Sequence, residues 1–326
     1  MERDMPRNPA PGPTIRLGVS SCLLGQEVRY DAGHSYEPFV AETLAAFFEL
    51  VPVCPEAELG MGTPRETVDL VGSVDAPRMV GTHSLTDWTV RMNRWSGQRA
   101  RQLGTDDICG YVFKRNSPSC GVFRVKVHPD QGRVRRQGRG LFAAEFARRY
   151  PLVPLEEEVR LHAPGVRDHF VVRVFALHRL QQIFAGRWRR EDLITFHARE
   201  TELLQTHDRS GLLRLDQLVA AMPRLRPAAF RLQYMSAFMG ILARIATPAK
   251  HARVLQSLAR YLKLHVTSGE LRLLQARIQD YRQGHLPLQV PHALLRYYGE
   301  LHGVDELCFP SYLNPDPREV MLRNHA

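Results

Sequence analysis

The chain has 326 residues, which favours two domains over one. Apolar residues make up 44% of it and charged residues 24%, as in ordinary globular proteins, and no apolar run approaches the roughly 18 residues that span a bilayer. The net charge is +10. The chain has five cysteines, an odd number, which makes a disulfide framework unlikely in a chain of this size.

The N-terminal segment 1–13 is polar and proline-rich and has no apolar core of a signal peptide. We therefore expect a disordered tail there and a cytoplasmic location for the protein. The positive charge comes almost entirely from arginine, whose planar guanidinium suits phosphate groups. A nucleic-acid partner would explain this bias, and so would a GC-rich genome that prefers arginine codons; composition leaves both open.

The first half of the chain is predicted to alternate strands with helices. The expected elements are strand 15–20, helix 37–50, strand 51–54, helix 87–104 and strands 110–114 and 122–127. This alternation indicates an α/β domain with a largely parallel sheet. A glycine-rich dinucleotide-binding turn is absent from the sequence.

The second half is predicted to be an all-α domain, because strand patterns fade after about residue 164. Helical periodicity marks 167–185, 191–208, 230–245, 249–265 and 268–281. Gly186 and the arginines that follow it indicate a break, which gives a tail at 1–13, a first domain at 14–185 and a helical domain at 186–326. The helical domain holds 20 of the 44 basic residues but only 13 of the 34 acidic ones, so it carries most of the excess charge.

Three cysteines follow predicted strands. Cys22, Cys54 and Cys120 each lie just past a strand end, beside glycine or proline. In a parallel sheet such strand ends share one edge, where ligand sites form, so the three thiols are able to converge there. They could also be ordinary buried thiols, which are common. No close C-x-x-C pair exists, so a zinc ribbon is disfavoured. Cys109 and Cys308 lack this setting and are expected to be packing residues.

Several segments carry a family resemblance. VSSCLLGQEVRYDAGH, VPVCPEAELGMGTPR, VFKRNSPSCG and LVPLEEEVRL, followed by RDHFVVRVFAL, resemble the thiouracil desulfidase (TudS-like) family over about residues 15–180. The segment YLKLHVTSGELRLLQARIQDYRQGHLPLQVPHALLRYY resembles a YbgA-like helical domain. The two-domain arrangement is similar to that of bacterial tRNA 4-thiouridine desulfidases.

The resemblance implies a cofactor and its ligands. It implies a 4Fe-4S cluster held by Cys22, Cys54 and Cys120, with one iron left open to take the sulfur of a thiocarbonyl. Where many family members have a second cysteine soon after the first, this chain has Val28, which cannot ligate iron. That difference fits a three-cysteine site.

The resemblance also implies two catalytic residues. Glu56 corresponds to a general base or proton shuttle, and Ser117 to a group that orients water or the pyrimidine. Each has an ordinary alternative role, Glu56 as a favourable carboxylate at a helix N-terminus and Ser117 as a turn-forming serine. Arg65 could meet a phosphate or pair with a carboxylate, and Arg29, Tyr30 and Asp31 could line the pocket or have a capping or salt-bridge role.

The predicted activity is replacement of the thiocarbonyl sulfur of 4-thiouridine in tRNA by oxygen, with release of sulfide. Salvage of free 2-thiouracil or 4-thiouracil, an RNA-binding protein with a structural cluster, and a metal-free enzyme with Cys120 as nucleophile are the alternatives. Thiolated tRNA or a free thiopyrimidine base is the expected partner. Candidate RNA contacts in the helical domain are Arg187, Trp188, Arg189 and Arg190, which could also be a solvated charge run beside a half-buried tryptophan.

Overall fold

The computed structural model describes residues 14–324, so the tail predicted at 1–13 lies outside the described residues. The chain divides into two compact units between residues 170 and 171. The division falls within helix α4 (Pro164–Ile183), upstream of the break expected at Gly186.

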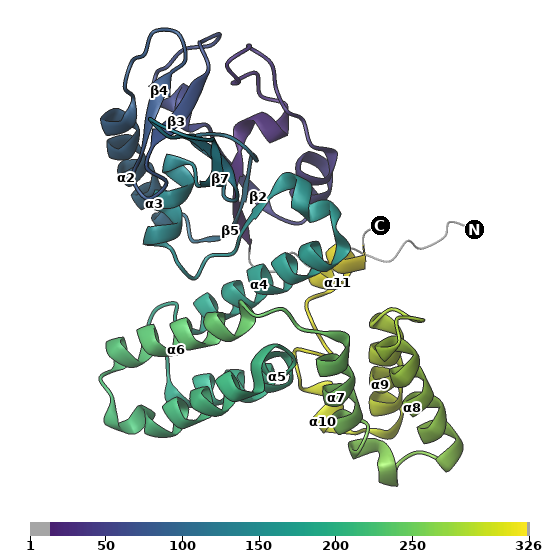
Figure 1. Cartoon of the computed structure of the whole chain (residues 1–326). Helices are drawn as coiled ribbons and strands as arrows, with labels where there is room; N and C mark the ends of the chain where they lie inside the picture. The colour runs from purple at the N-terminus through teal and green to yellow at the C-terminus, as the bar shows by residue number, and fades with distance from the viewer. Residues whose placement is uncertain (1–13, 325–326) are drawn as a thin grey trace, which may run out of the picture. The chain divides into compact units, whose positions relative to one another are not determined.

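A four-stranded parallel sheet, sheet A, forms the centre of the first unit (Figure 1). It contains β1 (Arg16–Ser20), β2 (Glu49–Val53), β5 (Ile108–Phe113) and β8 (Leu155–Glu157), in the order β2-β1-β5-β8. All three pairings are parallel, which confirms the predicted α/β domain with a largely parallel sheet.

A second, mixed sheet was not predicted as a separate layer. Sheet B has the strand order β4-β3-β6-β7. Its outer pairs, β3–β4 and β6–β7, are antiparallel, and its central pair, β3–β6, is parallel. Its strands are β3 (Val68–Gly72), β4 (Pro77–Gly81), β6 (Val125–His128) and β7 (Arg135–Gly138). The strand expected at 122–127 is β6, and it belongs to sheet B.

The helix predicted over 37–50 is wrong in type and extent. Only a π-helical turn (Phe39–Thr43) and a 3-10 turn (Leu44–Ala46) form there. Residues 49 and 50 are the first two of β2, because their backbone pairs in register with the start of β1. The other helical segments of this unit are a 3-10 turn (Ser21–Leu24), α1 (Pro55–Glu58), α2 (Thr89–Thr105), α3 (Leu141–Arg149) and a 3-10 turn (Glu158–His162).

An aromatic core covers one face of sheet A. Tyr111 and Phe113 stack with ring centroids 3.8 Å apart, and both meet Phe142 and Phe146 of α3. The Tyr111 ring lies so close to β1 that a Cβ at Gly18 would be 2.2 Å from its Cδ2 atom. Only glycine allows this approach. Burial of the aromatic rings between sheet A and α3 stabilises this part of the fold.

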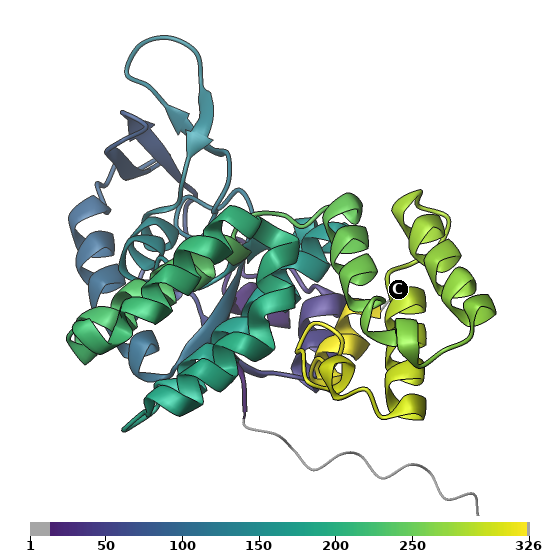
Figure 2. The ribbon, with the colours of Figure 1, turned by 90° about the horizontal axis from the view of Figure 1, so that it is seen from below.

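The second unit is helical, which confirms the predicted all-α domain. Beyond α4 it contains α5 (Arg190–Ala221), a 3-10 turn (Met222–Arg224), α6 (Pro227–Leu242), α7 (Pro248–Leu258), a 3-10 turn (Tyr261–Leu264), α8 (Ser268–Arg282), α9 (Gln289–His302), α10 (Asp305–Cys308) and α11 (Pro317–Asn324). Helices α5 and α6 lie side by side (Figures 1 and 2). Within residues 14–324 no helix has the length and apolar character needed to cross a membrane.

Buried ion pairs tie helices of this unit together. Arg179 on α4 donates to both carboxylate oxygens of Glu200 on α5, at 2.8 and 2.9 Å, and to Glu319 on α11 at 3.2 Å. The Glu200 side chain is fully buried, so loss of Arg179 would leave an uncompensated charge in the core.

Candidate active site at the carboxyl ends of sheet A

Three cysteines gather at one edge of sheet A. Cys22 lies in the 3-10 turn after β1, Cys54 follows β2 directly, and Cys120 lies in the loop after β5. The three strands are parallel neighbours, and Ser20 of β1 is in register with Val53 of β2, so their carboxyl ends coincide. All three cysteines line a single cavity of about 660 Å³, as the strand-end argument expected.

Cys22 and Cys120 are buried and Cys54 is half-buried, and the three thiols interact electrostatically. Burial, with a smaller contribution from a negative charge at Cys54, raises the pKa of Cys22 to about 11. Burial is also the main cause that raises the pKa of Cys54, and it raises that of Cys120 well above the ordinary range. Burial therefore disfavours the thiolate form of Cys120, which makes a metal-free thiolate nucleophile at this position unfavourable.

The donor set at this edge consists of sulfur. Cysteine thiolates are the usual ligands of iron–sulfur clusters, and an iron centre supplies the positive charge that buried thiolates require. Within residues 14–324 no three or more Cys, His, Asp or Glu side chains form a group suited to one metal ion. A cluster of several irons is larger than a single ion, and its ligands stand farther apart around a cavity. The three cysteines fit such a cluster in donor type and in their placement around one cavity.

The two remaining cysteines lie elsewhere. Cys109 is buried within β5, and its Sγ atom is 3.4 Å from the carbonyl oxygen of Asp107. Cys308 is exposed at the end of α10, so the expectation that it packs in the core was wrong. Neither of them lines the cavity.

Glu56 lies on α1, two residues after Cys54, and its carboxylate is held on both oxygens. Its Oε2 atom accepts hydrogen bonds from Nε and Nη2 of Arg65 at 3.1 and 2.5 Å. Both side chains are largely buried, with 14% of Glu56 and 5% of Arg65 exposed. Of the two roles considered for Arg65, the structure gives it the carboxylate partner, and this charge-assisted pair fixes the direction of Glu56.

Ser117 connects to Glu56 through a second serine. The Ser119 hydroxyl donates to Oε1 of Glu56 at 2.6 Å, and the Ser117 and Ser119 hydroxyl oxygens are 3.0 Å apart. Because the single hydroxyl proton of Ser119 is directed at Glu56, Ser117 must be the donor to Ser119. Ser117, Ser119 and Glu56 therefore form a hydrogen-bonded chain, which we call the Ser-Ser-Glu chain. Sequence reasoning missed the part played by Ser119.

Two buried glutamates hold the loop that carries these serines. Glu158 accepts a hydrogen bond from the backbone N–H of Arg115 at 2.8 Å and forms an ion pair with Lys114. Glu157 accepts from the N–H groups of Val122 and Phe123 at 2.8 and 3.0 Å. The loop is thus anchored at both ends to the carboxyl end of β8, within the segment LVPLEEEVRL. The sequence pattern of this segment does not predict that role.

The segment after Cys22 also contributes to the cavity. Arg29 and Tyr30 line it, whereas Asp31 does not and forms an ion pair with Arg29 at 3.5 Å, the alternative role considered for this segment. Val28 contributes its carbonyl oxygen, which lies 3.7 Å from Sγ of Cys54 and accepts a hydrogen bond from Arg65 at 3.0 Å. Because the contact uses the backbone, it does not depend on the side chain at this position.

Gly140 is a further residue on which the site depends. A Cβ atom there would lie 2.5 Å from the backbone C and O atoms of Ser119 and 2.8 Å from the backbone nitrogen of Cys120. We expect Gly140→Ala to lower the free energy of unfolding by about 1–3 kcal/mol and to displace the Cys120 loop. Thermal unfolding, with iron content, measures both effects. Gly165→Ala is the matched control, because its Cβ would meet no atom within 4 Å; equal behaviour of the two variants would contradict the prediction.

The predicted RNA-contact segment in the second unit makes mostly local contacts. The Trp188 ring stacks on Phe230 with centroids 5.8 Å apart and meets Phe184 edge to face at 5.3 Å. Arg189 forms a two-pronged ion pair with Asp192, with both contacts at 2.9 Å. The RNA role of these residues stays a prediction.

Comparisons with known proteins match both units. The sequence model of the 2-thiouracil desulfurase family matches residues 17–158, and that of a family of unknown function, DUF1722, matches residues 203–317. The uncharacterized protein YbgA of Escherichia coli (strain K12) is 28% identical over 158 residues, which is 48% of this chain and 94% of YbgA. The uncharacterized protein YbbK of Bacillus subtilis (strain 168) is 30% identical over 108 residues, 32% of this chain and 71% of YbbK. A solved structure, the 4Fe-4S-dependent thiouracil desulfidase TudS, shares 28% identity and covers 46% of this chain and 94% of its own, with a TM-score of 0.39.

Proposed function

Because the chain belongs to the 2-thiouracil desulfurase family through its N-terminal unit, we propose that it is an iron–sulfur-dependent desulfidase that exchanges the thiocarbonyl sulfur of a pyrimidine for oxygen. The observation that carries the proposal is the meeting of Cys22, Cys54, Cys120 and the Ser-Ser-Glu chain around one cavity. The three cysteines would hold a 4Fe-4S cluster. The volume of about 660 Å³ is in the range of small-molecule sites.

The reaction replaces one bond to carbon by another. The C=S bond of the substrate breaks, a C=O bond forms with the oxygen of water, and the two protons of water leave with sulfide or to solvent. A 4Fe-4S cluster held by the three cysteines would supply a thiophilic Lewis acid for the sulfur of the thiocarbonyl.

The chain's own contribution is proton transfer. Ser117 Oγ also accepts the backbone N–H groups of Ser119 and Cys120, at 3.3 and 3.1 Å. Water that takes the place of the longer of these contacts can lose a proton through Ser117 and Ser119 to the Glu56 carboxylate, without direct contact between water and Glu56. The Arg65 pair keeps the carboxylate aimed at Ser119. When the sulfur leaves, the same chain can return the proton in the opposite direction.

The preferred substrate is 4-thiouridine in tRNA. The net charge of +10, carried mostly by arginine, supports a polyanionic substrate over a free base. Salvage of free 2-thiouracil or 4-thiouracil uses the same chemistry without that charge. A purely structural cluster gives no reason for a partly buried Ser-Ser-Glu chain beside its ligands.

The proposal predicts a coloured, iron-containing protein that releases sulfide. After anaerobic purification we expect broad visible absorbance and about four irons per chain. Thiolated tRNA, 4-thiouracil and 2-thiouracil are then compared at one salt concentration, with sulfide and the oxygenated product measured together. We expect equal amounts of both products, with tRNA the most efficient substrate. Full iron content without sulfide from any substrate would favour the structural cluster, and faster turnover of free bases with no tRNA binding would favour salvage.

A further inference from the structure

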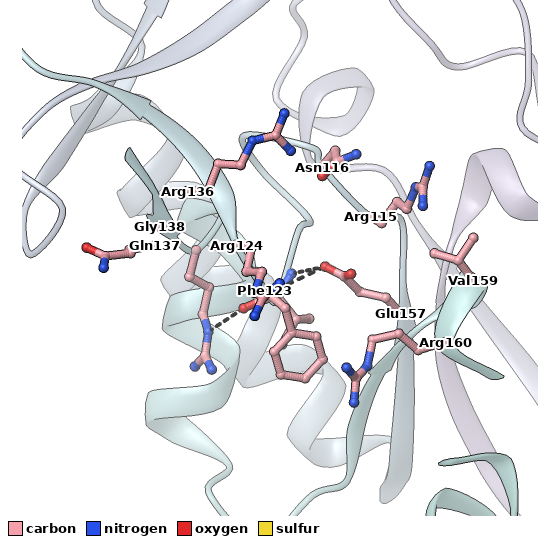
Figure 3. Close-up of a pocket in the computed structure, with 12 residues that line it drawn as sticks. Arg115, Asn116, Phe123, Arg124, Arg136, Gln137, Gly138, Glu157, Val159 and Arg160 are labelled. Carbon is pink, nitrogen blue, oxygen red and sulfur yellow. Dashed lines mark hydrogen bonds between the residues drawn. The ribbon is translucent and has the colours of Figure 1, made fainter. Parts of the chain in front are cut away.

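A second cavity, rich in arginine, lies in the same unit as the cysteine cavity. Its volume is about 1110 Å³. Five arginines line it, which we call the arginine groove: Arg115, Arg124, Arg136, Arg139 and Arg160. Figure 3 shows the guanidinium groups of Arg136 and Arg115 on either side of Asn116, and all five arginines are exposed.

Most of this charge is not neutralised by the protein. Among residues 14–324, Arg115, Arg124 and Arg136 form no ion pair. Arg160 is paired with Glu156 at 2.6 Å. The one acidic residue that lines the groove, Glu157, has its Oε1 atom occupied by two backbone N–H groups of the loop. The groove therefore presents several free guanidinium groups to solvent.

The charge is concentrated in one segment of the chain. Residues 114–139 contain eight arginines and lysines and a single acidic residue, Asp130. Within the β6–β7 hairpin, Lys126 and Arg136 are cross-strand partners. Like charges in directly opposed positions destabilise a strand pair, so a bound anion would relieve a cost that the free protein carries.

The groove adjoins the cysteine cavity. Arg115 and Asn116 line both of them. Lys126 lines the cysteine cavity, and its cross-strand partner Arg136 lines the groove. An anion in the groove would consequently lie beside residues that also line the cysteine cavity.

We propose that the arginine groove binds the phosphodiester backbone of an RNA beside the nucleotide whose thiolated base enters the cysteine cavity. The inference rests on the proposed desulfidase function and adds the surface that selects a polymeric substrate. A single phosphate needs one or two guanidinium groups, whereas the groove offers several along its length, as successive phosphates of a strand require. Phosphate contacts of this kind fix the position of the strand while the base is turned out of its stack.

The test compares charge removal inside and outside the groove in the full-length, iron-loaded protein. Binding of bulk tRNA to the wild type, followed by fluorescence anisotropy, should weaken log-linearly with salt. The double variant Arg124→Gln/Arg136→Gln should bind about 10-fold or more weakly at low salt and reduce the slope by about 1–2. Arg124→Lys/Arg136→Lys should keep most of the slope, because lysine retains the charge.

Arg94→Gln/Arg101→Gln is the matched control, since it removes two exposed charges from α2 that line neither cavity. It should leave the affinity and the slope near those of the wild type. Wild-type behaviour of the Arg124/Arg136 double variant, or a loss of slope in Arg187→Gln/Arg190→Gln instead, would overturn the proposal. So would uridine monophosphate displacing tRNA at equal phosphate concentration, because the groove would then recognise one nucleotide. These readings need no turnover, so a wild type that binds tRNA but releases no sulfide would count against the proposed function alone.

Discussion

Replacing Cys22, Cys54 or Cys120 by alanine, one at a time, is expected to remove most of the bound iron, with desulfidation lost by about 10³-fold or more. Each change takes away one of three sulfur donors around the cavity, and two thiolates cannot hold a cluster that relies on three. Iron content, visible absorbance and sulfide release, measured after anaerobic purification, give the result. Loss of activity without loss of iron would point to a thiol that reacts and does not ligate.

The cysteines outside the cavity provide the controls. Cys109→Ser and Cys308→Ser should keep iron and activity, because neither side chain reaches the cavity. Burial raises the pKa of Cys109 to about 12, so it is a neutral packing group in the folded protein. Cys54 is the least buried of the three cysteines. Full iron occupancy in Cys54→Ala would show that Cys54 is not a ligand and would contradict the three-cysteine assignment.

The strands that carry the cysteines could be predicted because their patterns are local. β1 and β5 are largely apolar and buried, with Gly25 and Pro118 marking the loops that follow them, and such runs indicate buried parallel strands. The positions of Cys22 and Cys120 after those strands then follow from the topology of any parallel sheet.

Sheet B could not be predicted because its strands depend on partners distant in sequence. β7 reads Arg-Arg-Gln-Gly and has three exposed residues in succession, so no alternation marks it as a strand. β3 pairs with β4 nearby but also with β6, more than 50 residues later. The register of such pairings is set by tertiary packing, which a single sequence does not display.

The contacts that complete the site were hidden for a related reason. Ser119 meets Glu56 across 63 residues, and Glu157 meets Val122 across 35. Gly140 is required by the closeness of the Cys120 loop, which has no sequence pattern of its own. One feature of the sequence indicates the arginine groove: the density of arginine between residues 114 and 139. The net charge of the whole first half does not show it, because acidic residues elsewhere in that half offset the positive charge.

The Ser-Ser-Glu chain predicts catalytic losses that do not add. Glu56→Gln, Ser117→Ala and Ser119→Ala should each keep iron and visible absorbance but slow sulfide release by about 10²-fold or more. Because the proton passes along one chain, removing any member interrupts it. The double variant Ser117→Ala/Ser119→Ala should therefore be about as slow as either single variant. Serines that acted independently would instead give a product of the two losses, about 10⁴-fold.

Ser84→Ala is the matched control for the Ser-Ser-Glu chain. The Ser84 hydroxyl donates to Glu66, so the variant deletes the same kind of serine–glutamate hydrogen bond outside the cysteine cavity. It should retain near-native turnover with unchanged iron. A loss of activity in this variant equal to that in Ser119→Ala would show that general weakening of the fold, and not an interrupted proton path, explains the slow enzymes. Near-native turnover in Ser119→Ala would show that Ser119 is not needed for proton transfer. Ser117 would then act on water without passing a proton to Glu56.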